Sequence, residues 1–512
     1  MTRSGSLVLL LSVFLVAVAS LIYELIAGAV SSYLLGNSIA QFSIVIGIFL
    51  TAMGLGSFLS KYIENNLLPR FIQVEVAIGL VGGFSASILF LCFAYTEIYF
   101  TALVTVSGIV GTFIGLEIPL IIRILREREG SLRITVSNVM TVDYIGALVA
   151  SLAFPFLLVP HLGLLRASFL VGLLNIGVAW LGLGYFREES KKIRSLPAFA
   201  FVATLLVAGG LLFSSALVDF FEERIYPDEI IYAKQTKYQR IVITKWREDV
   251  RLFIDGKLQF STKDEYRYHE SLVHPAMSAR EKAEDILVLG GGDGMAAREI
   301  LKYPRVKSID LVDIDPEMTR LFREKEMLAR LSDYALRDPK VNVINRDAMR
   351  FLQENGKSYD VILMDLPDPG DLTLGKLYTK SFYTFAGKRL GPRGIICVQS
   401  SSPFFAPMAF WCIVNTLDTT PVAPGPARTF FVRPYHANVP SFGEWGFTLA
   451  SPFPIDLGML EVKVETQFID NELMKSMFKF PPDMDHRETK INRLDNQILV
   501  EYYISGYKEF ND

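Results

Sequence analysis

Long apolar stretches dominate the chain before about residue 216, and shorter apolar runs in mixed sequence follow them. A transmembrane helix needs about 20 mostly apolar residues to cross the hydrocarbon core. Stretches of this kind lie near residues 6–28, 39–60, 73–95, 99–122, 137–158, 164–185 and 196–216. The first is too long for a cleaved signal peptide, and six more follow it. The pattern predicts an α-helical polytopic membrane domain of about seven spans over residues 1–216.

The remainder divides into three parts. Residues 226–275 alternate polar and apolar positions, and "VRLFIDGKLQF" turns at Asp255-Gly256, which predicts a small β subdomain. Residues 276–455 carry the apolar runs "ILVLG", "SIDLVDI", "VNVIN", "DVILMD" and "GIICVQ", separated by helical stretches. Such alternation is typical of a parallel sheet covered by helices, a Rossmann-like α/β domain.

The last part, residues 456–512, is predicted to be a polar, partly helical tail. Apolar positions at Ile491, Leu494 and Leu499 are spaced for docking onto the α/β domain.

The composition agrees with a membrane protein and argues against nucleic-acid binding, a disulfide framework and a metal site. The mean hydropathy of +0.33 agrees with a membrane protein. A net charge of -3 over 512 residues gives no basic field, so nucleic acid is not an expected partner. Three scattered cysteines and five dispersed histidines show neither a disulfide framework nor metal-ligand spacing. No metal site is expected.

Basic residues are concentrated in alternate loops of the membrane domain. They are Lys61, Arg70, Arg123, Arg126, Arg128, Arg133, Arg187, Lys191, Lys192 and Arg194. Because such residues are retained in the cytoplasm, the pattern places the N-terminus inside and, with seven spans, everything after residue 216 outside.

Three acids, Glu24, Glu117 and Asp143, fall within the predicted spans. Ionisable groups in a bilayer are costly, so they indicate either a cation path or protonated groups that face the bundle interior. Both interpretations stay open at this point.

Polar residues end each predicted parallel strand, at the edge where open α/β sheets bind ligands. They are Gly290 to Gly294, Asp313, Asp347, Asp365 with Asp368, and Gln399. A glycine turn followed about 20 residues later by an acid is typical of a nucleoside site, with Asp313 accepting from the ribose hydroxyls. Asp347, next to Ala348, is placed to accept from an adenine amino group.

Asp293 lies inside the glycine turn, where a dinucleotide or S-adenosylmethionine would bring an anion. Like charges 4 Å apart cost about 4 kcal/mol at an effective dielectric near 20. A nucleoside with an amine and no carboxylate, such as decarboxylated S-adenosylmethionine, avoids that cost. In "YDVILMDLPDPG", Asp365 and Asp368 lie three residues apart, so one can bind an ammonium while the other takes a proton from the attacking nitrogen.

From about Tyr232 to Ala450 the chain resembles the polyamine aminopropyltransferases, the spermidine synthase family. The resemblance rests on "KYQRIVI", "DGKLQFSTKDEYRYHESLVHPAM", "LVLGGGDGMAAREILKYPRVKSIDLVDID", "YDVILMDLPDP", "LYTKSFY" and "GIICVQSSSP". With its membrane part, the chain is similar to the bacterial membrane-fused members.

The resemblance implies a role for each matching residue. Asp365 would accept the proton and Asp368 would bind the amine. The 5'-methylthioadenosine portion would contact Gln239, Asp313, Asp347 and Ala348. His269 and Asp293 would contact the polyamine or aminopropyl arm, and Tyr268, Gln259 and Gln399 match pocket positions. Leu366, Pro367 and Phe442 depart from the usual residues, and Glu444 is a candidate to replace the tyrosine hydroxyl that Phe442 lacks.

The expected reaction is therefore aminopropyl transfer from decarboxylated S-adenosylmethionine, a co-substrate, to putrescine, which gives spermidine. The alternatives are a methyltransferase that uses S-adenosylmethionine and a polyamine-binding membrane carrier or sensor. The protein is expected in the cell membrane. The supply of decarboxylated S-adenosylmethionine favours a catalytic domain on the cytoplasmic side, whereas the charge pattern places that domain outside. Homo-oligomers are an expectation from related soluble enzymes.

Overall fold

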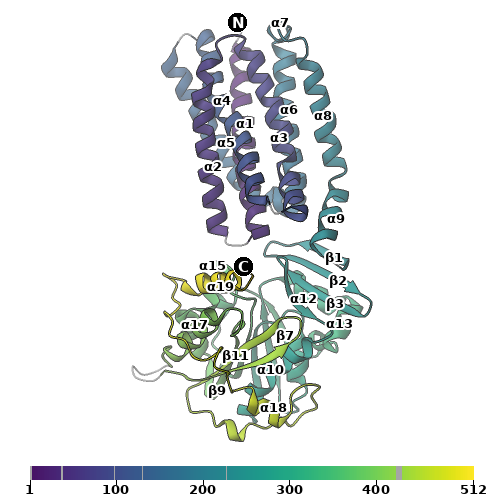
Figure 1. The fold of residues 1–512 in the computed structure, drawn as a ribbon, viewed down its shortest axis with the longest axis vertical. Coiled ribbons are helices and arrows are strands. Elements are labelled where there is room, and N and C mark those ends of the chain that lie inside the picture. The colour runs from purple at the N-terminus through teal and green to yellow at the C-terminus, as the bar shows by residue number, and fades with distance from the viewer. Residues whose placement is uncertain are drawn as a thin grey trace. The chain divides into compact units, whose positions relative to one another are not determined.

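The chain divides into two compact units, Met1–Glu229 and Ile230–Asp512. The first is helical and the second is built on two β-sheets (Figure 1). The residues that the computed structural model describes are 3–35, 38–96, 98–129, 131–226, 228–422 and 429–511.

The helical unit packs long apolar helices side by side. They are α1 (Arg3–Leu35), α2 (Ser38–Leu59), α3 (Leu67–Tyr95), α4 (Tyr99–Glu129), α5 (Leu132–Ala153), α6 (Val159–Tyr185) and α8 (Leu196–Leu212). The shorter elements are η1 (Ser60–Tyr62), the π-helical η2 (Phe154–Leu158), α7 (Arg187–Ser190) and α9 (Ser214–Ile225). Helices α3 and α6 approach so closely that a Cβ on Gly79 would lie 2.6 Å from the Gly172 carbonyl oxygen. Small residues permit this contact.

The predicted count of seven spans is not supported. By length and composition alone, five described helical segments could cross a membrane, namely Gly5–Leu35, Ile39–Tyr62, Leu67–Tyr95, Tyr99–Arg126 and Leu132–Tyr185. The prediction separated residues 137–158 from 164–185, but the helical hydrogen bonding continues between them through η2. The prediction also extended the last span to residue 216, whereas α8 ends at Leu212 after 17 residues.

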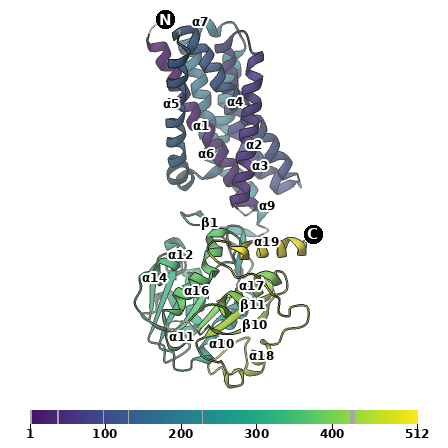
Figure 2. The same cartoon turned by 90° about the vertical axis from the view of Figure 1, so that its left-hand side faces the viewer.

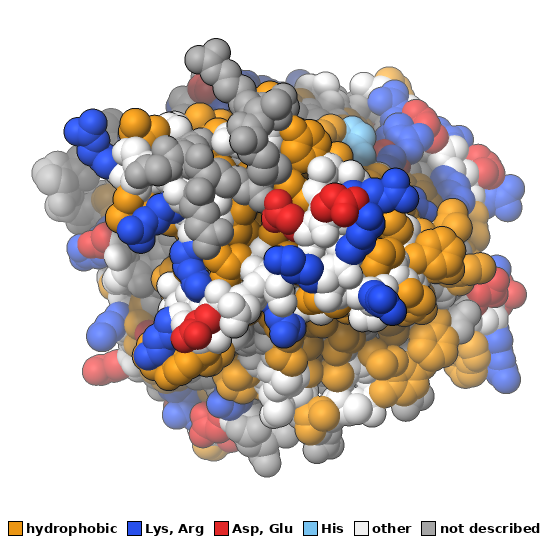
Figure 3. Space-filling view, turned by 90° about the horizontal axis from the view of Figure 1, so that it is seen from above, with side chains coloured by type: hydrophobic (Ala, Val, Ile, Leu, Met, Phe, Trp, Pro, Cys, Tyr) orange, Lys and Arg blue, Asp and Glu red, His pale blue; other side chains and the backbone are white. Residues whose placement is uncertain are grey.

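Basic side chains gather at one end of the helical unit. Figure 3 looks onto the end with the N-terminus and α7, where Lys and Arg side chains gather among apolar ones. An Arg123 guanidinium nitrogen donates to the Ser60 carbonyl at 3.0 Å, which ties the end of α4 to η1 there. The side chain of Arg128 lies outside the described part of the structure.

A buried polar cluster lies inside the bundle. Glu117 is 1% exposed, which agrees with the prediction that the acids face the bundle interior. Glu75, which the sequence reasoning missed, is 0% exposed. The Asn175 amide donates to Glu75 at 2.9 Å and accepts from the Tyr23 hydroxyl at 3.1 Å. These bonds join three helices, α1, α3 and α6, while Glu24 and Asp143 are only half-buried.

The second unit begins with the predicted β subdomain. Its strands are β1 (Glu229–Gln235), β2 (Arg240–Trp246), β3 (Asp249–Ile254) and β4 (Lys257–Ser261), paired in that order. The predicted turn joins β3 to β4, with positive φ at Asp255 (48°) and Gly256 (78°). Both angles suit the tight turns that match strand twist.

The larger sheet has the order β10-β11-β9-β8-β5-β6-β7. Its parallel strands are β5 (Asp285–Gly290), β6 (Ser308–Asp313), β7 (Val341–Asn345), β8 (Tyr359–Asp365) and β9 (Leu390–Gln399). The antiparallel strands are β10 (Phe431–Val439) and β11 (Gly443–Ser451). This arrangement confirms the Rossmann-like prediction, and the strand order reverses between β5 and β8.

Helices cover both faces of this sheet (Figure 2). One core contains residues of α10 (Glu265–Ala279), α11 (Met295–Leu301) and α12 (Pro316–Glu324), and the other contains residues of α14 (Ala348–Glu354), α16 (Lys380–Gly387) and α17 (Pro407–Asp418). The remaining short helices are α13 (Glu326–Ala329), η3 (Arg330–Ser332), η4 (Ala335–Arg337), α15 (Leu372–Gly375) and η5 (Lys376–Tyr378).

The C-terminal tail docks onto the α/β domain through η6 (Leu457–Met459), α18 (Asn471–Ser476) and α19 (Ile498–Asn511). Leu499 is fully buried and α19 packs against α17. Leu494 is 52% exposed, so its predicted docking role is wrong, because it precedes the helix whose period the prediction assumed. Glu270 on α10 anchors the middle of the tail by accepting the backbone N–H groups of residues 467, 468 and 469 at 2.6, 2.8 and 2.9 Å.

We predict that Glu270→Ala lowers the free energy of unfolding by at least about 3 kcal/mol, because three charge-assisted hydrogen bonds disappear and buried donors lose their acceptor. Thermal unfolding of the detergent-purified chain measures the loss, and proteolysis should reach residues 456–512 first. Glu472→Ala, at an exposed position of the same tail, is the matched control. Equal stability of the two variants would contradict the anchoring role.

Candidate functional site

The site is formed where β5 and β8 end side by side. Gly290 pairs with Asp365, and the Gly291 N–H donates to the Asp365 carbonyl at 3.2 Å. A Cβ on Gly290 would lie 1.9 Å from that carbonyl oxygen, and φ is 86° there, so only glycine fits. Because the strand order reverses at this point, the ends of the two strands border the crevice where open α/β sheets bind ligands.

Asp365 is half-buried at this crevice and receives the Tyr268 hydroxyl of α10 at 2.8 Å. Burial raises the pKa of Asp365 to about 6, while the His269 charge and the Tyr268 hydrogen bond act in the opposite direction. At neutral pH the group is therefore a carboxylate that readily takes a proton. The structure brings Tyr268, His269 and Asp365 together, as predicted.

His269, also on α10, is a cation held in place by its neighbours. Burial lowers its pKa, but the hydrogen bond and charge of Glu265, 2.7 Å from Nδ1, outweigh burial and raise the pKa to about 9. Arg298 holds the other Glu265 oxygen at 2.9 Å. Asp293, in the glycine turn, has its pKa raised by burial and lowered by the His269 charge. Its Oδ1 caps the next helix by accepting from the Met295 N–H at 2.8 Å.

Asp313 ends β6 beside the same turn. Its oxygens accept from the Gly292 and Asp315 N–H groups at 3.1 and 2.8 Å. Burial, with the charges of Asp315 and Asp293, raises its pKa to about 7. A Cβ on Gly292 would lie 2.5 Å from Asp313 Oδ2, so the turn and the acid are fitted to each other.

Three further residues are predicted to contact the nucleoside. Asp347 begins α14, accepting from the Arg350 N–H at 3.0 Å, and it pairs with Lys376 at 3.0 Å. Ala348 is 8% exposed, and Gln239 is half-buried in the turn between β1 and β2. Both Asp347 oxygens thus already accept one hydrogen bond.

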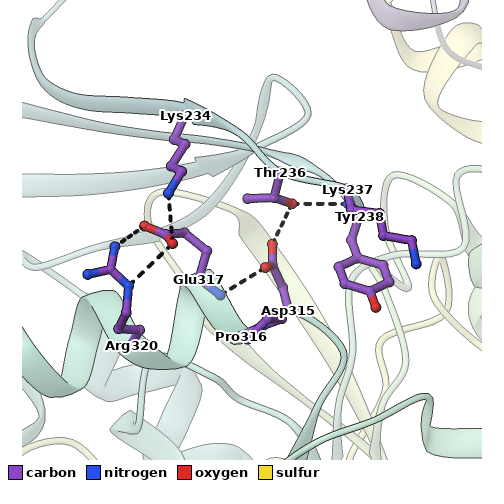
Figure 4. A pocket seen from close by; sticks show the side chains of 8 residues that line it. All are labelled: Lys234, Thr236, Lys237, Tyr238, Asp315, Pro316, Glu317 and Arg320. Carbon is purple, nitrogen blue, oxygen red and sulfur yellow. Dashed lines mark hydrogen bonds and ion pairs between the residues drawn. The ribbon is translucent and has the colours of Figure 1, made fainter. Parts of the chain in front are cut away.

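A pocket of about 260 Å³ lies next to this turn, between it and the start of α12 (Figure 4). None of the predicted site residues lines it. The Lys234–Glu317 ion pair joins β1 to α12 there, and Arg320 of α12 also pairs with Glu317. The Thr236 hydroxyl donates to Asp315 at 2.8 Å. Asp315, missed by the sequence reasoning, thereby fixes the small sheet to the loop after Asp313.

The second acid of the pair, Asp368, lies in the loop after β8. Gln399 Nε2 contacts Asp368 at 3.4 Å, although its shorter bonds, both 2.6 Å, go to the Leu366 carbonyl and the Tyr378 hydroxyl. Gln399 is 1% exposed, so it mainly fixes the loop. Burial raises the pKa of Asp368 to about 6, while the Lys257 charge and the Tyr503 hydroxyl lower it.

Lys257 and Tyr503 were both missed by the sequence reasoning. Lys257 lies in the hairpin that turns at Asp255-Gly256, but nothing in the sequence points to its partner. Tyr503 lies in the tail, about 135 positions after Asp368, and only its helical spacing could have indicated it. Gln259, in contrast, donates only to the backbone carbonyls of its own strand, at 3.1 and 3.4 Å.

Glu444, the candidate to replace the missing tyrosine hydroxyl, already has partners on the neighbouring strand. Its carboxylate pairs with His436 and accepts from the Asn438 amide at 3.3 Å, both on β10. Phe442 packs instead against Tyr268, with ring centroids 6.1 Å apart. The role suggested for Glu444 therefore stays a prediction, and β10 supplies competing partners for its carboxylate.

Among the described residues, Glu270, His274 and Glu299 form a group with metal-ligand spacing. Their atoms already have protein partners, since Glu270 holds the tail and His274 Nε2 lies 3.1 Å from Glu299. Arg298 and Lys302 also pair with Glu299. The donor set is that of a buried ion-pair network.

Taken together, carboxyl groups outnumber cations around the crevice. Asp293, Asp313, Asp365 and Asp368 approach it from the ends of three strands, β5, β6 and β8. His269, Arg298 and Lys257 are the nearby cations among the described residues that lower the pKa of one or more of these acids. Such a site favours a cationic ligand and opposes an anionic one.

Comparison with known proteins finds relatives of this chain. The family description "Spermine/spermidine synthase domain" matches residues 265–452. A polyamine aminopropyltransferase of Leptospira interrogans is 45% identical, covering 97% of both chains, and polyamine aminopropyltransferase 2 of Ralstonia nicotianae is 46% identical, covering 98% of both. A crystal structure of spermidine synthase with the transition-state analogue AdoDATO is 25% identical, with a TM-score of 0.45, over 49% of this chain and 86% of the other.

We predict that Asp365→Asn stabilises the ligand-free chain at pH 8 by roughly 2–4 °C, because the raised pKa reports a carboxylate that folding disfavours. The folded state binds the proton more tightly than the unfolded chain does, so the cost grows as pH rises from about 4 to 6 and then stays constant. Tryptophan fluorescence during heating measures this. The exposed Asp495→Asn is the control, and an Asp365→Asn effect independent of pH would overturn the assignment.

Proposed function

The chain belongs to the family of polyamine aminopropyltransferases, and we propose that it transfers the aminopropyl group of decarboxylated S-adenosylmethionine to putrescine, giving spermidine and 5'-methylthioadenosine. The observation that carries the proposal is Asp365, a carboxylate at the strand reversal that accepts from Tyr268 and adjoins the glycine turn.

The reaction is a direct displacement. The neutral amine nitrogen of putrescine attacks the aminopropyl carbon bonded to the sulfonium, the new N–C bond forms, and the C–S bond breaks with its electron pair going to sulfur. Asp365 takes the proton that the new ammonium loses, which its pKa of about 6 allows. Since sulfonium is a good leaving group, the protein mainly aligns and desolvates the reactants.

The nucleoside is proposed to bind over the glycine turn. Asp313 accepts from the ribose hydroxyls, and Gln239, Asp347 and Ala348 contact the rest of the 5'-methylthioadenosine portion. The close fit of Gly292 against Asp313 supports this, because it holds the Asp313 carboxylate against the glycine turn. Lys376 lies on Asp347, so an adenine amino group would use the remaining acceptor capacity of that carboxylate.

The aminopropyl arm and the acceptor amine are proposed to lie among the acids. Asp293 and His269 contact the arm or the polyamine, Asp368 binds the amine, and Tyr268 orients Asp365. Gln399 contributes by holding the loop of Asp368. Intact S-adenosylmethionine would bring a carboxylate close to Asp293, which argues against the methyltransferase alternative.

The helical unit is proposed to be a membrane domain over residues 1–216, followed by the β subdomain 226–275, the catalytic domain 276–455 and the tail 456–512. Seven crossings require the segment Leu132–Tyr185 to reverse. Gly163, with φ of 72°, supplies a break, and both α5 and α6 pack against α1. The 17 residues of α8 are at the lower limit for a crossing.

A second candidate function, carriage of polyamines or of protons, is favoured by Glu75 and Glu117. Each has one buried oxygen without a hydrogen-bond partner among the described residues. Uptake of labelled spermidine by proteoliposomes tests this role. Glu75→Gln should abolish uptake while product formation continues.

We predict that Asp365→Asn lowers turnover by at least about a hundredfold, since general-base catalysis contributes about 10² to 10⁴. Mass spectrometry of products from putrescine, cadaverine, agmatine and spermidine measures transfer and identifies the acceptor. Calorimetry should give an unchanged affinity for decarboxylated S-adenosylmethionine. A near-normal rate in the variant would remove Asp365 from the mechanism.

We predict that a reporter fused after Asp512 is active in the cytoplasm, because decarboxylated S-adenosylmethionine is supplied there. The basic end of the helical unit, with an odd number of crossings, predicts the opposite side. Paired reporters active on either side of the membrane decide the question. An external signal would refute the cytoplasmic placement and support the charge pattern.

A further inference from the structure

Three segments distant in sequence meet beside Asp368. Gly370 lies two residues after this acid, and a Cβ built there would be 2.1 Å from Lys257 Nζ and 3.6 Å from Tyr503 Cε1. The Lys257 ammonium lies 5.1 Å from the centroid of the Tyr503 ring. The first residue of β4, the loop after β8 and helix α19 therefore form one small site.

The Tyr503 hydroxyl can donate a hydrogen bond to a carboxylate while it stays uncharged. It is 9% exposed, and burial together with the charge of Asp368 raises its pKa, so the phenol stays protonated. Its hydroxyl interacts with Asp368 and lowers the pKa of that acid. A neutral donor leaves the negative charge of Asp368 available for a cation.

Lys257 is chemically the same group as one end of an alkyl diamine. Its primary ammonium lies over the Tyr503 ring, and its charge lowers the pKa of the Asp368 carboxylate. A carboxylate and an aromatic ring are the two features that bind alkylammonium ions. The residue is exposed, and its four-carbon stem is flexible, so it can leave without disturbing the sheet. Two ammonium groups 4 Å apart would repel by about 4 kcal/mol at an effective dielectric near 20.

We propose that Asp368 and Tyr503 form the binding site for the ammonium of the acceptor amine, and that Lys257 occupies this site until the amine displaces it. The proposal rests on the proposed function and adds two residues to it. The C-terminal helix thereby becomes part of the acceptor site, and the lysine acts as an internal competitor for polyamines.

The test compares Tyr503→Phe and Lys257→Met with Tyr502→Phe in the full-length chain. Tyr502, the adjacent residue on α19, has its hydroxyl 3.5 Å from the Lys490 N–H in the tail, so its substitution is a matched control. Tyr503→Phe should raise the KM for putrescine about tenfold, and Lys257→Met should lower it severalfold. The affinity for decarboxylated S-adenosylmethionine should be unchanged in both.

Opposite shifts of the KM for the amine are the result that a merely structural role would not give. If Tyr503→Phe behaves as Tyr502→Phe does, or if Lys257→Met raises the KM, the proposal is overturned. Calorimetric titration with putrescine separates it from the reaction itself. If the wild-type chain makes no aminopropylated product, the same opposite shifts in Kd would still support the amine site, and their absence would refute it.

Discussion

Carboxyl groups buried at one edge of a parallel sheet are the constraint on which the rest of this structure depends. Parallel strands end on the same side of a sheet. The direction of the strands is therefore enough to bring together the acids that follow β5, β6 and β8. Gly290 makes the convergence possible, because a side chain there would collide with the carbonyl of Asp365. The resulting negative crevice is unfavourable without a ligand and favourable with a cationic one.

Helix α10 shows how the fold supports that unfavourable site. One of its faces carries Tyr268 and His269 to the acids, while Glu265 fixes His269 and Arg298. The next residue, Glu270, holds the backbone of the tail. A single helix therefore connects the acids of the crevice to the segment that returns to deliver Tyr503. The tail is thus a structural part of the site, and its removal would leave Glu270 as a buried charge without donors.

The sequence predicted those parts of the protein that depend on local periodicity or on the ends of strands. The sheet, the hairpin at Asp255 and the position of Asp365 are of this kind, whereas Tyr268 and His269 were predicted beside Asp365 only through the family resemblance. Residues identified by a partner elsewhere in the chain were not predictable. Glu75 is identified only by its contact with Asn175, and Tyr503 only by its interaction with Asp368. The pairing of Glu444 with His436 could not be predicted for the same reason.

The different roles proposed for Asp365 and Asp368 rest on their neighbours and not on their acidity. Burial raises the pKa of both to about 6, so titration alone does not distinguish a base from an ammonium ligand. Asp365 lies at the end of a strand, against the glycine turn and a single neutral donor, where an attacking nitrogen can deliver its proton. Asp368 lies in a loop beside an aromatic ring and a lysine ammonium, an environment in which a cation is already stabilised. The first environment favours a group that gains a proton for a moment, and the second favours one that keeps its charge throughout the reaction.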